Sequence, residues 1–112
     1  MRSISTHVLD ITRGRPASGV AVVLERKEGA GFARLREATT DADGRIKDLV
    51  PEGALTEGTY RVTFDTGAYF AAQGVEGFYP EAAVVFVVRD AGAHYHVPLL
   101  LGPFGYSTYR GS

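Results

Sequence analysis

The sequence predicts an all-β protein built as a sandwich of two sheets. Apolar and polar residues alternate with a period of two over most of the chain, and each such segment ends at glycine, proline or aspartate. A single short segment has the composition and end signals of a helix. One helix among seven or eight strands favours a β-sandwich with a connecting helix over an α/β fold with a parallel sheet.

The first half of the chain supplies four predicted strands. Alternation or a valine-rich run defines them as Ile4–Asp10, Val20–Arg26, Phe32–Thr40 and Gly58–Asp65.

Turns are predicted where glycine, proline and aspartate gather. Gly14-Arg15-Pro16 and Gly102-Pro103 break the chain by freeing or fixing φ. Asp41-Ala42-Asp43-Gly44 has the side chains of a tight reversal, and a short strand after Gly44 would be the eighth. The same four residues resemble the start of a calcium loop, but the later oxygen ligands of such a loop are missing, so we expect a turn.

The second half supplies the helix and the remaining strands. The helix is expected over Thr66–Gly74, with Asp65 or Thr66 as its N-cap and Gly74 as its stop. Ala82–Arg89 is β-branched and aromatic throughout, which is typical of a strand covered on both faces. Two further strands are predicted at His94–Leu101 and Tyr106–Arg110.

Length and composition limit the possible functions. A chain of 112 residues has room for a single domain, which we expect to span residues 1–112. The absence of cysteine excludes a cysteine nucleophile and a cysteine-ligated metal site. A net charge of -1 offers no broad attraction for nucleic acid or an anionic membrane, so neither is expected as a partner. No apolar stretch approaches a membrane span or a signal sequence, and we expect a cytoplasmic protein.

Three histidines are the first candidates for chemistry. His94 and His96 are two residues apart in one predicted strand and therefore share a face, with Tyr95 on the other. His7 shares a face of the first strand with Ser5. A three-histidine zinc site is conceivable, but strand histidines are more often structural or solvent-facing, so we expect no metal and place His94 at a strand edge.

The last residues form a second candidate. Hydroxyl-bearing side chains and an arginine crowd the segment Gly105–Ser112, and the free carboxylate after Ser112 is expected to be a functional group. By contrast, a Ser-His-Asp triad has no G-x-S-x-G elbow to support it, and no carboxylate pair suggests a glycosidase.

Four blocks of this sequence, in order along the chain, resemble 5-hydroxyisourate hydrolases, the transthyretin-related enzymes of urate breakdown. They are Ser5–Asp10, Thr40–Arg45, Tyr95–Leu101 and Tyr106–Ser112, the last ending in the family's Tyr-Arg-Gly-Ser signature. The resemblance implies two four-stranded sheets with a short helix after the fifth strand. It also implies a homotetramer with paired active sites across a channel.

The resemblance assigns the site to His7, Arg45, His96, Tyr109 and Ser112. The implied reaction opens the ring amide of 5-hydroxyisourate to give 2-oxo-4-hydroxy-4-carboxy-5-ureidoimidazoline. It needs an activated water and a stabilised carbonyl oxygen, which imidazole and guanidinium can provide without metal or organic cofactor. His7 or His96 is expected to be the general base, and which of the two remains open at this stage.

Two other functions fit the same strand count. A transthyretin-like carrier of small molecules shares the sandwich, but the hormone carrier has lysine at the position of His7 and lacks the Tyr-Arg-Gly-Ser ending. An immunoglobulin-like adhesion module would explain neither the signature nor histidines near both ends of the chain. The sequence therefore favours the hydrolase.

Overall fold

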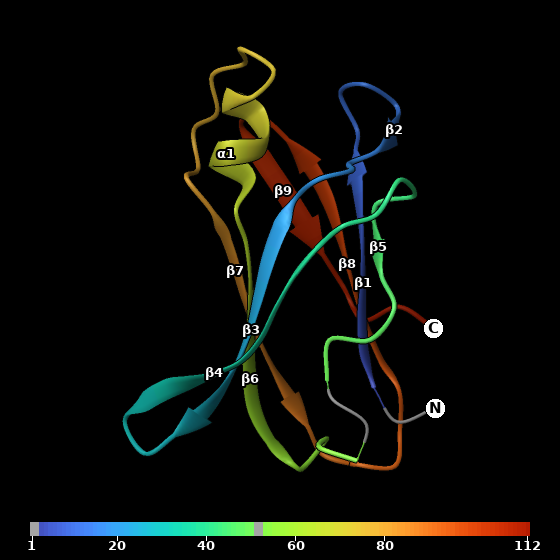
Figure 1. Cartoon of the computed structure of the whole chain (residues 1–112), viewed down its shortest axis with the longest axis vertical. Coiled ribbons are helices and arrows are strands. Elements are labelled where there is room, and N and C mark those ends of the chain that lie inside the picture. The colour runs from blue at the N-terminus through green and yellow to red at the C-terminus, as the bar shows by residue number, and fades with distance from the viewer. Residues whose placement is uncertain (1–2, 51–52) are drawn as a thin grey trace.

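A computed structural model describes residues 3–50 and 53–112, which form two sheets facing each other (Figure 1). The elements follow in the order β1 (Ile4–Asp10), β2 (Arg15–Pro16), β3 (Ala21–Glu28), β4 (Gly31–Thr39), β5 (Arg45–Ile46), β6 (Gly58–Phe64), α1 (Thr66–Ala71), β7 (Ala82–Val88), β8 (Tyr95–Gly102) and β9 (Gly105–Thr108). The predicted all-β sandwich with one short helix is confirmed, and the predicted strands match the observed ones to within two residues at their ends.

The first sheet is organised around the parallel pair of β1 and β8. These strands pair from Ile4 opposite Tyr95 to Asp10 opposite Leu101. Strand β9 pairs antiparallel with the outer edge of β8, and the short strands β2 and β5 pair with different parts of the free edge of β1. Two short strands thus share the place of the fourth strand expected from the sequence.

The second sheet is a fully antiparallel arrangement in the order β4-β3-β6-β7. Alternate residues of both sheets point inward and form one apolar core, as the period of two requires. Its largest fully buried members are Tyr60, Phe64, Ile4, Leu24, Leu49, Leu99, Leu101, Val8, Val20, Val22, Val50 and Val62. The opposite face of each sheet is left for solvent, a partner or a ligand.

Helix α1 connects β6 to β7 at one end of the sandwich (Figure 1). Asp65 is its N-cap, with a carboxylate oxygen that accepts the backbone N–H of Ala68 at 3.1 Å. The helix ends at Ala71, earlier than predicted, because the chain passes through a turn to Gly74 in the left-handed conformation (φ 68°). No helix in the described part of the chain is long and apolar enough to cross a membrane.

Two expectations about strands were wrong. The strand over Ala82–Arg89 was expected to be covered on both faces. It is the edge strand β7, and Val85 and Val87 on one of its faces are 57% and 44% exposed. Arg15 and Pro16, expected only as part of a turn, pair with Asp10 and Leu9 as β2. Proline is tolerated there because an edge strand needs no N–H on its free side.

Candidate active site

The outward face of β1 brings residues from three strands together. His7 pairs with Arg45 of β5 on one side of β1, and Ser5 pairs with His96 of β8 on the other. Directly paired residues share a face of the sheet, so these four side chains meet on the face turned away from the core. The structure therefore brings His7, Arg45 and His96, three of the residues that the resemblance assigns to the site, into one neighbourhood.

The Asp41–Gly44 turn places Arg45. One carboxylate oxygen of Asp41 accepts the backbone N–H groups of Asp43 and Arg45, both at 2.9 Å. The bond from the Arg45 N–H is the main reason that the pKa of Asp41 lies below its usual value. Gly44 then accepts the backbone N–H of Val8 at 2.7 Å, which fixes the turn against β1.

Gly44 is required at this position for two reasons. Its φ is 73°, in the left-handed region, and a Cβ there would lie 2.4 Å from the carbonyl oxygen of Val8. The close approach of the turn to β1 is thus possible because the side chain is missing.

His94 joins the site, although the sequence predicted only a strand-edge role for it. The hydroxyl of the buried Ser5 is hydrogen-bonded to His94 Nε2 at 2.9 Å and to His96 Nδ1 at 2.7 Å. Tyr95, between the two histidines, points into the core as expected. The two-residue spacing of His94 and His96 indicated that they share a face of the strand. What they contact depends on the parallel pairing of β8 with β1, which the sequence alone does not reveal.

Electrostatics favour a neutral His96. Burial lowers the pKa of its imidazole below the usual value, and electrostatic repulsion, first from Arg45 and then from any charge on His7 or His94, lowers it further. At neutral pH this ring is uncharged and can offer one N–H and one lone pair.

The C-terminal segment closes one side of the site. The backbone N–H of Gly111 donates to the carbonyl oxygen of His96 at 2.9 Å, which carries Ser112 back to β8. A pocket of about 410 Å³ results, lined by Ser5, Thr6, Arg45, Ile46, Lys47, His94, His96 and Ser112. His7 does not line this pocket itself and adjoins it through its partner Arg45.

Tyr109 is the one predicted site residue that the chain does not bring to this cluster. It is 57% exposed and lines a separate pocket of about 210 Å³ beside β7 and β8. Arg110, whose direction the sequence left open, lies over the ring of Tyr95 at 4.4 Å and donates to the carbonyl oxygen of His94 at 3.3 Å.

A metal site finds no geometric support in the residues that the structure describes. No group of three or more His, Asp or Glu side chains among them is arranged to hold an ion. Instead, His94 and His96 are hydrogen-bonded to the Ser5 hydroxyl, and His7 lies opposite Arg45 in the sheet.

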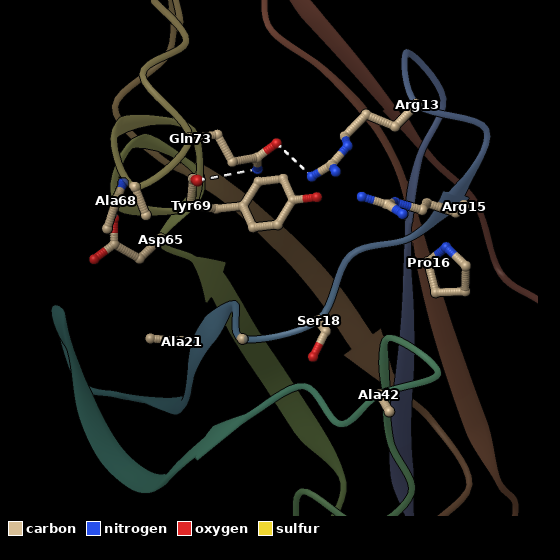
Figure 2. Close-up of a pocket in the computed structure, with 12 residues that line it drawn as sticks. Arg13, Arg15, Pro16, Ser18, Ala21, Ala42, Asp65, Ala68, Tyr69 and Gln73 are labelled. Carbon is tan, nitrogen blue, oxygen red and sulfur yellow. Dashed lines mark hydrogen bonds between the residues drawn. The ribbon is translucent and has the colours of Figure 1, made fainter.

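A larger pocket, of about 590 Å³, lies at the other end of the molecule beside α1 and contains none of the predicted site residues. Figure 2 shows its polar wall, where Arg13 donates to the Gln73 side chain at 2.7 Å. The hydroxyl of Tyr69 donates to the buried Asp10 at 2.8 Å, and burial, followed by this bond, raises the pKa of Tyr69. These contacts fasten α1 to the loop after β1.

Residues 4–111 match the family described as HIUase/Transthyretin family. The chain belongs to this family. The 5-hydroxyisourate hydrolase of Salmonella dublin is 52% identical over 109 residues, which cover 97% of this chain and 80% of that protein. The structure of Klebsiella pneumoniae 5-hydroxyisourate hydrolase is similar with a TM-score of 0.89 and 42% identity, covering all of both chains.

A second similar structure was solved with a bound small molecule. Sea bream transthyretin, solved in complex with thyroxine, is similar with a TM-score of 0.92 and 37% identity over 96% of this chain and 93% of that one. Since both kinds of relative share this sandwich, the fold cannot distinguish them, and the choice depends on the side chains of the outward face.

Proposed function

We propose that this protein is a 5-hydroxyisourate hydrolase that opens the substrate ring to 2-oxo-4-hydroxy-4-carboxy-5-ureidoimidazoline. The observation that carries the proposal is the meeting of His7, Arg45 and His96 on one sheet face, beside a pocket that Ser112 helps to line. Relatives that share about half of its residues carry this name. A carrier would have no need of two imidazoles and a guanidinium gathered on one patch.

The chemistry follows from these groups. A neutral imidazole takes a proton from water, whose oxygen then attacks the ring carbonyl carbon, and the carbonyl oxygen gains negative charge. The Arg45 guanidinium balances that charge and holds the flat, anionic ring. When the ring C–N bond breaks, the departing nitrogen takes the proton from the imidazole. Histidine, arginine and water supply every part of this reaction, so no cofactor is needed.

A complete site requires more than one copy of the chain. His7, Arg45 and His96 lie on an open sheet face, whereas Tyr109 of the same chain lines a different pocket. A second copy laid against this face would cover the pocket and could bring its own Tyr109 to it. A homotetramer with paired sites accounts for both observations, and a small domain gains stability by burying a sheet face. We propose that it works in the cytoplasm.

The competing function is that of a small-molecule carrier, which the likeness to the thyroxine complex of sea bream transthyretin favours. The two proposals differ at Arg45 and His7, since the proposed hydrolysis needs both side chains. Thyroxine binding without hydrolysis would favour the carrier.

The deciding experiment measures the near-ultraviolet absorbance of freshly generated 5-hydroxyisourate. We expect faster decay with the protein than without it, and an unchanged decay rate would contradict the proposal. His7→Ala and Arg45→Ala should each remove most of the acceleration and leave the β-sheet circular dichroism intact. Arg36→Ala, at an exposed position on β4 of the other sheet, is the matched control and should retain full activity.

A further inference from the structure

The hydroxyl of Ser5 lies between two imidazoles. Ser5 Oγ is 2.9 Å from His94 Nε2 and 2.7 Å from His96 Nδ1, and these are its two hydrogen bonds among the described residues. Ser5 is 7% exposed, so solvent offers it little alternative. The three side chains, all of which line the pocket, therefore form a short chain of hydrogen bonds in its wall.

Proton counting limits the direction of this chain. A hydroxyl has a single proton, so Ser5 can donate one of its two bonds and must accept the other from a ring N–H. With both rings neutral there are two consistent directions. Either His94 donates and Ser5 donates onward to His96, or the whole chain runs the opposite way.

The remaining ring nitrogen of His94 distinguishes the two directions. His94 Nδ1 is buried and has no hydrogen-bond partner among the described residues. If the chain ran from His96 to His94, a neutral His94 would carry its proton on this nitrogen, as a buried N–H without an acceptor. Buried N–H groups without partners are rarer in proteins than buried acceptors without partners.

Both distances, 2.9 Å at His94 and 2.7 Å at His96, are within hydrogen-bond range, so the buried Nδ1 of His94 decides the direction. The chain then runs from His94 Nε2–H to the Ser5 hydroxyl, and from that hydroxyl to His96 Nδ1.

We propose that Ser5 and His94 are positioning residues that fix the tautomer of His96, with its proton on Nε2. This inference rests on the proposed hydrolase function and assigns different roles to His7 and His96. His96 offers a neutral N–H as a hydrogen-bond donor to the carbonyl oxygen, together with Arg45. Because His96 Nδ1 is occupied by Ser5, His7 is the general base.

Proton balance is kept by His7 alone. It takes one proton from water as the water oxygen bonds to the carbonyl carbon, and it returns this proton to the ring nitrogen as the C–N bond breaks. His96 keeps its Nε2 proton throughout and strengthens its hydrogen bond as the oxygen becomes negative. A neutral imidazole suits this role because it donates without adding another cation beside Arg45.

The direct test is the tautomer of His96 in the intact protein. In protein labelled with ¹⁵N at histidine, long-range ¹H–¹⁵N spectra above the titration of His96 should show a protonated Nε2 and an unprotonated Nδ1, with His96→Gln to assign the signals. A proton on Nδ1 would overturn the proposal. This readout does not depend on turnover, so a protein without hydrolase activity would refute the proposed function while still testing the tautomer.

Kinetics test the positioning role. Ser5→Ala should lower kcat about tenfold with little change in KM, the size of loss expected when a partner that orients a histidine is removed. His94→Gln keeps an N–H near the place of Nε2 and should retain most of the activity, whereas His94→Phe should lose it to a similar extent as Ser5→Ala. Ser18→Ala, at an exposed position, is the control. Unchanged kcat in both Ser5→Ala and His94→Phe would contradict the role.

Discussion

Gly111 lies against the imidazole of His96. Its N–H donates to the His96 carbonyl oxygen at 2.9 Å, and a Cβ at Gly111 would be 2.5 Å from His96 Cδ2. The ring cannot swing away freely, because Ser5 holds its Nδ1. The C-terminal segment and the His96 ring therefore share a space that any larger residue would disturb.

Gly111→Ala is expected to lower kcat/KM by more than about tenfold with a small effect on stability, since misplacing a catalytic group by a fraction of an ångström is costly while the core is untouched. The control is Gly105→Ala, where a Cβ would meet no atom within 4 Å. Decay of substrate absorbance and thermal unfolding are the measurements. Equal activity of the two variants would show that the contact has no part in catalysis.

Gly44→Ala should destabilise the fold more than Gly14→Ala. Both glycines have a left-handed φ, 73° and 69°, so both variants lose about 1–2 kcal/mol of backbone preference. At Gly44 a Cβ would also collide with the Val8 carbonyl, whereas Gly14 has no atom within 4 Å. We expect an additional loss of about 1–3 kcal/mol, measured by urea unfolding. A similar loss of stability in both variants would mean that the turn at Gly44 can move away from the Val8 carbonyl without loss of free energy.

The stability of the protein should fall as the pH drops below the usual histidine pKa of 6.5. The pKa of His96 is lowered in the folded state, chiefly by burial, so between the two pKa values the unfolded chain binds the extra proton. Free energies of unfolding measured from about pH 8 to about pH 5 should show this slope, and His96→Gln should reduce it. An identical slope in the variant would show that His96 is not the source of the effect.

Tyr69→Phe is expected to destabilise the protein by about 1.5–3 kcal/mol, the usual size for a hydrogen bond to a charged group. The hydroxyl of Tyr69 donates to Asp10, whose side chain is 1% exposed, and its loss leaves that carboxylate with only backbone donors. Tyr79→Phe, on a residue that is 40% exposed, should change the free energy of unfolding by less than about 0.5 kcal/mol. Equal effects would show that Asp10 does not depend on the Tyr69 hydroxyl.

Much of the fold was predictable because its signals are local. The period of two predicted a strand over Ile4–Asp10, which are the observed bounds of β1, and the Asp-rich turn before Arg45 predicted β5. The misjudged face of β7 has a physical cause: Val85 and Val87 have strand propensity wherever they lie, and only the sheet order shows that β7 is an edge.

The site was predictable only in part, because its geometry depends on pairing between distant segments. The alternation of β1 put Ser5 and His7 on one face, but nothing local to residues 94–96 indicates that they run parallel to β1. That pairing brings His94 to Ser5, which sequence reasoning missed. The position of Tyr109 has the same origin, since the path of the chain after β9 carries it to another pocket.

If Tyr109 contributes to the site, it must come from a neighbouring copy of the chain. His7→Ala and Tyr109→Phe proteins are then expected to be weakly active alone and to recover activity when they are unfolded together and refolded as a mixture. Where a Tyr109→Phe chain meets a His7→Ala chain, one of the two sites between them has both native residues. Random assembly of equal amounts should therefore restore about a quarter of the wild-type activity.

The expected recovery depends on the arrangement of the site and not only on mixing. If His7 and Tyr109 of the same chain served one site, every site in the mixture would carry one substitution, and the activity would equal the average of the two variants. Mixing His7→Ala with Arg45→Ala is the control, because these residues pair within one chain and no recovery is expected. Recovery in the control would contradict the assignment of His7 and Arg45 to one chain's site.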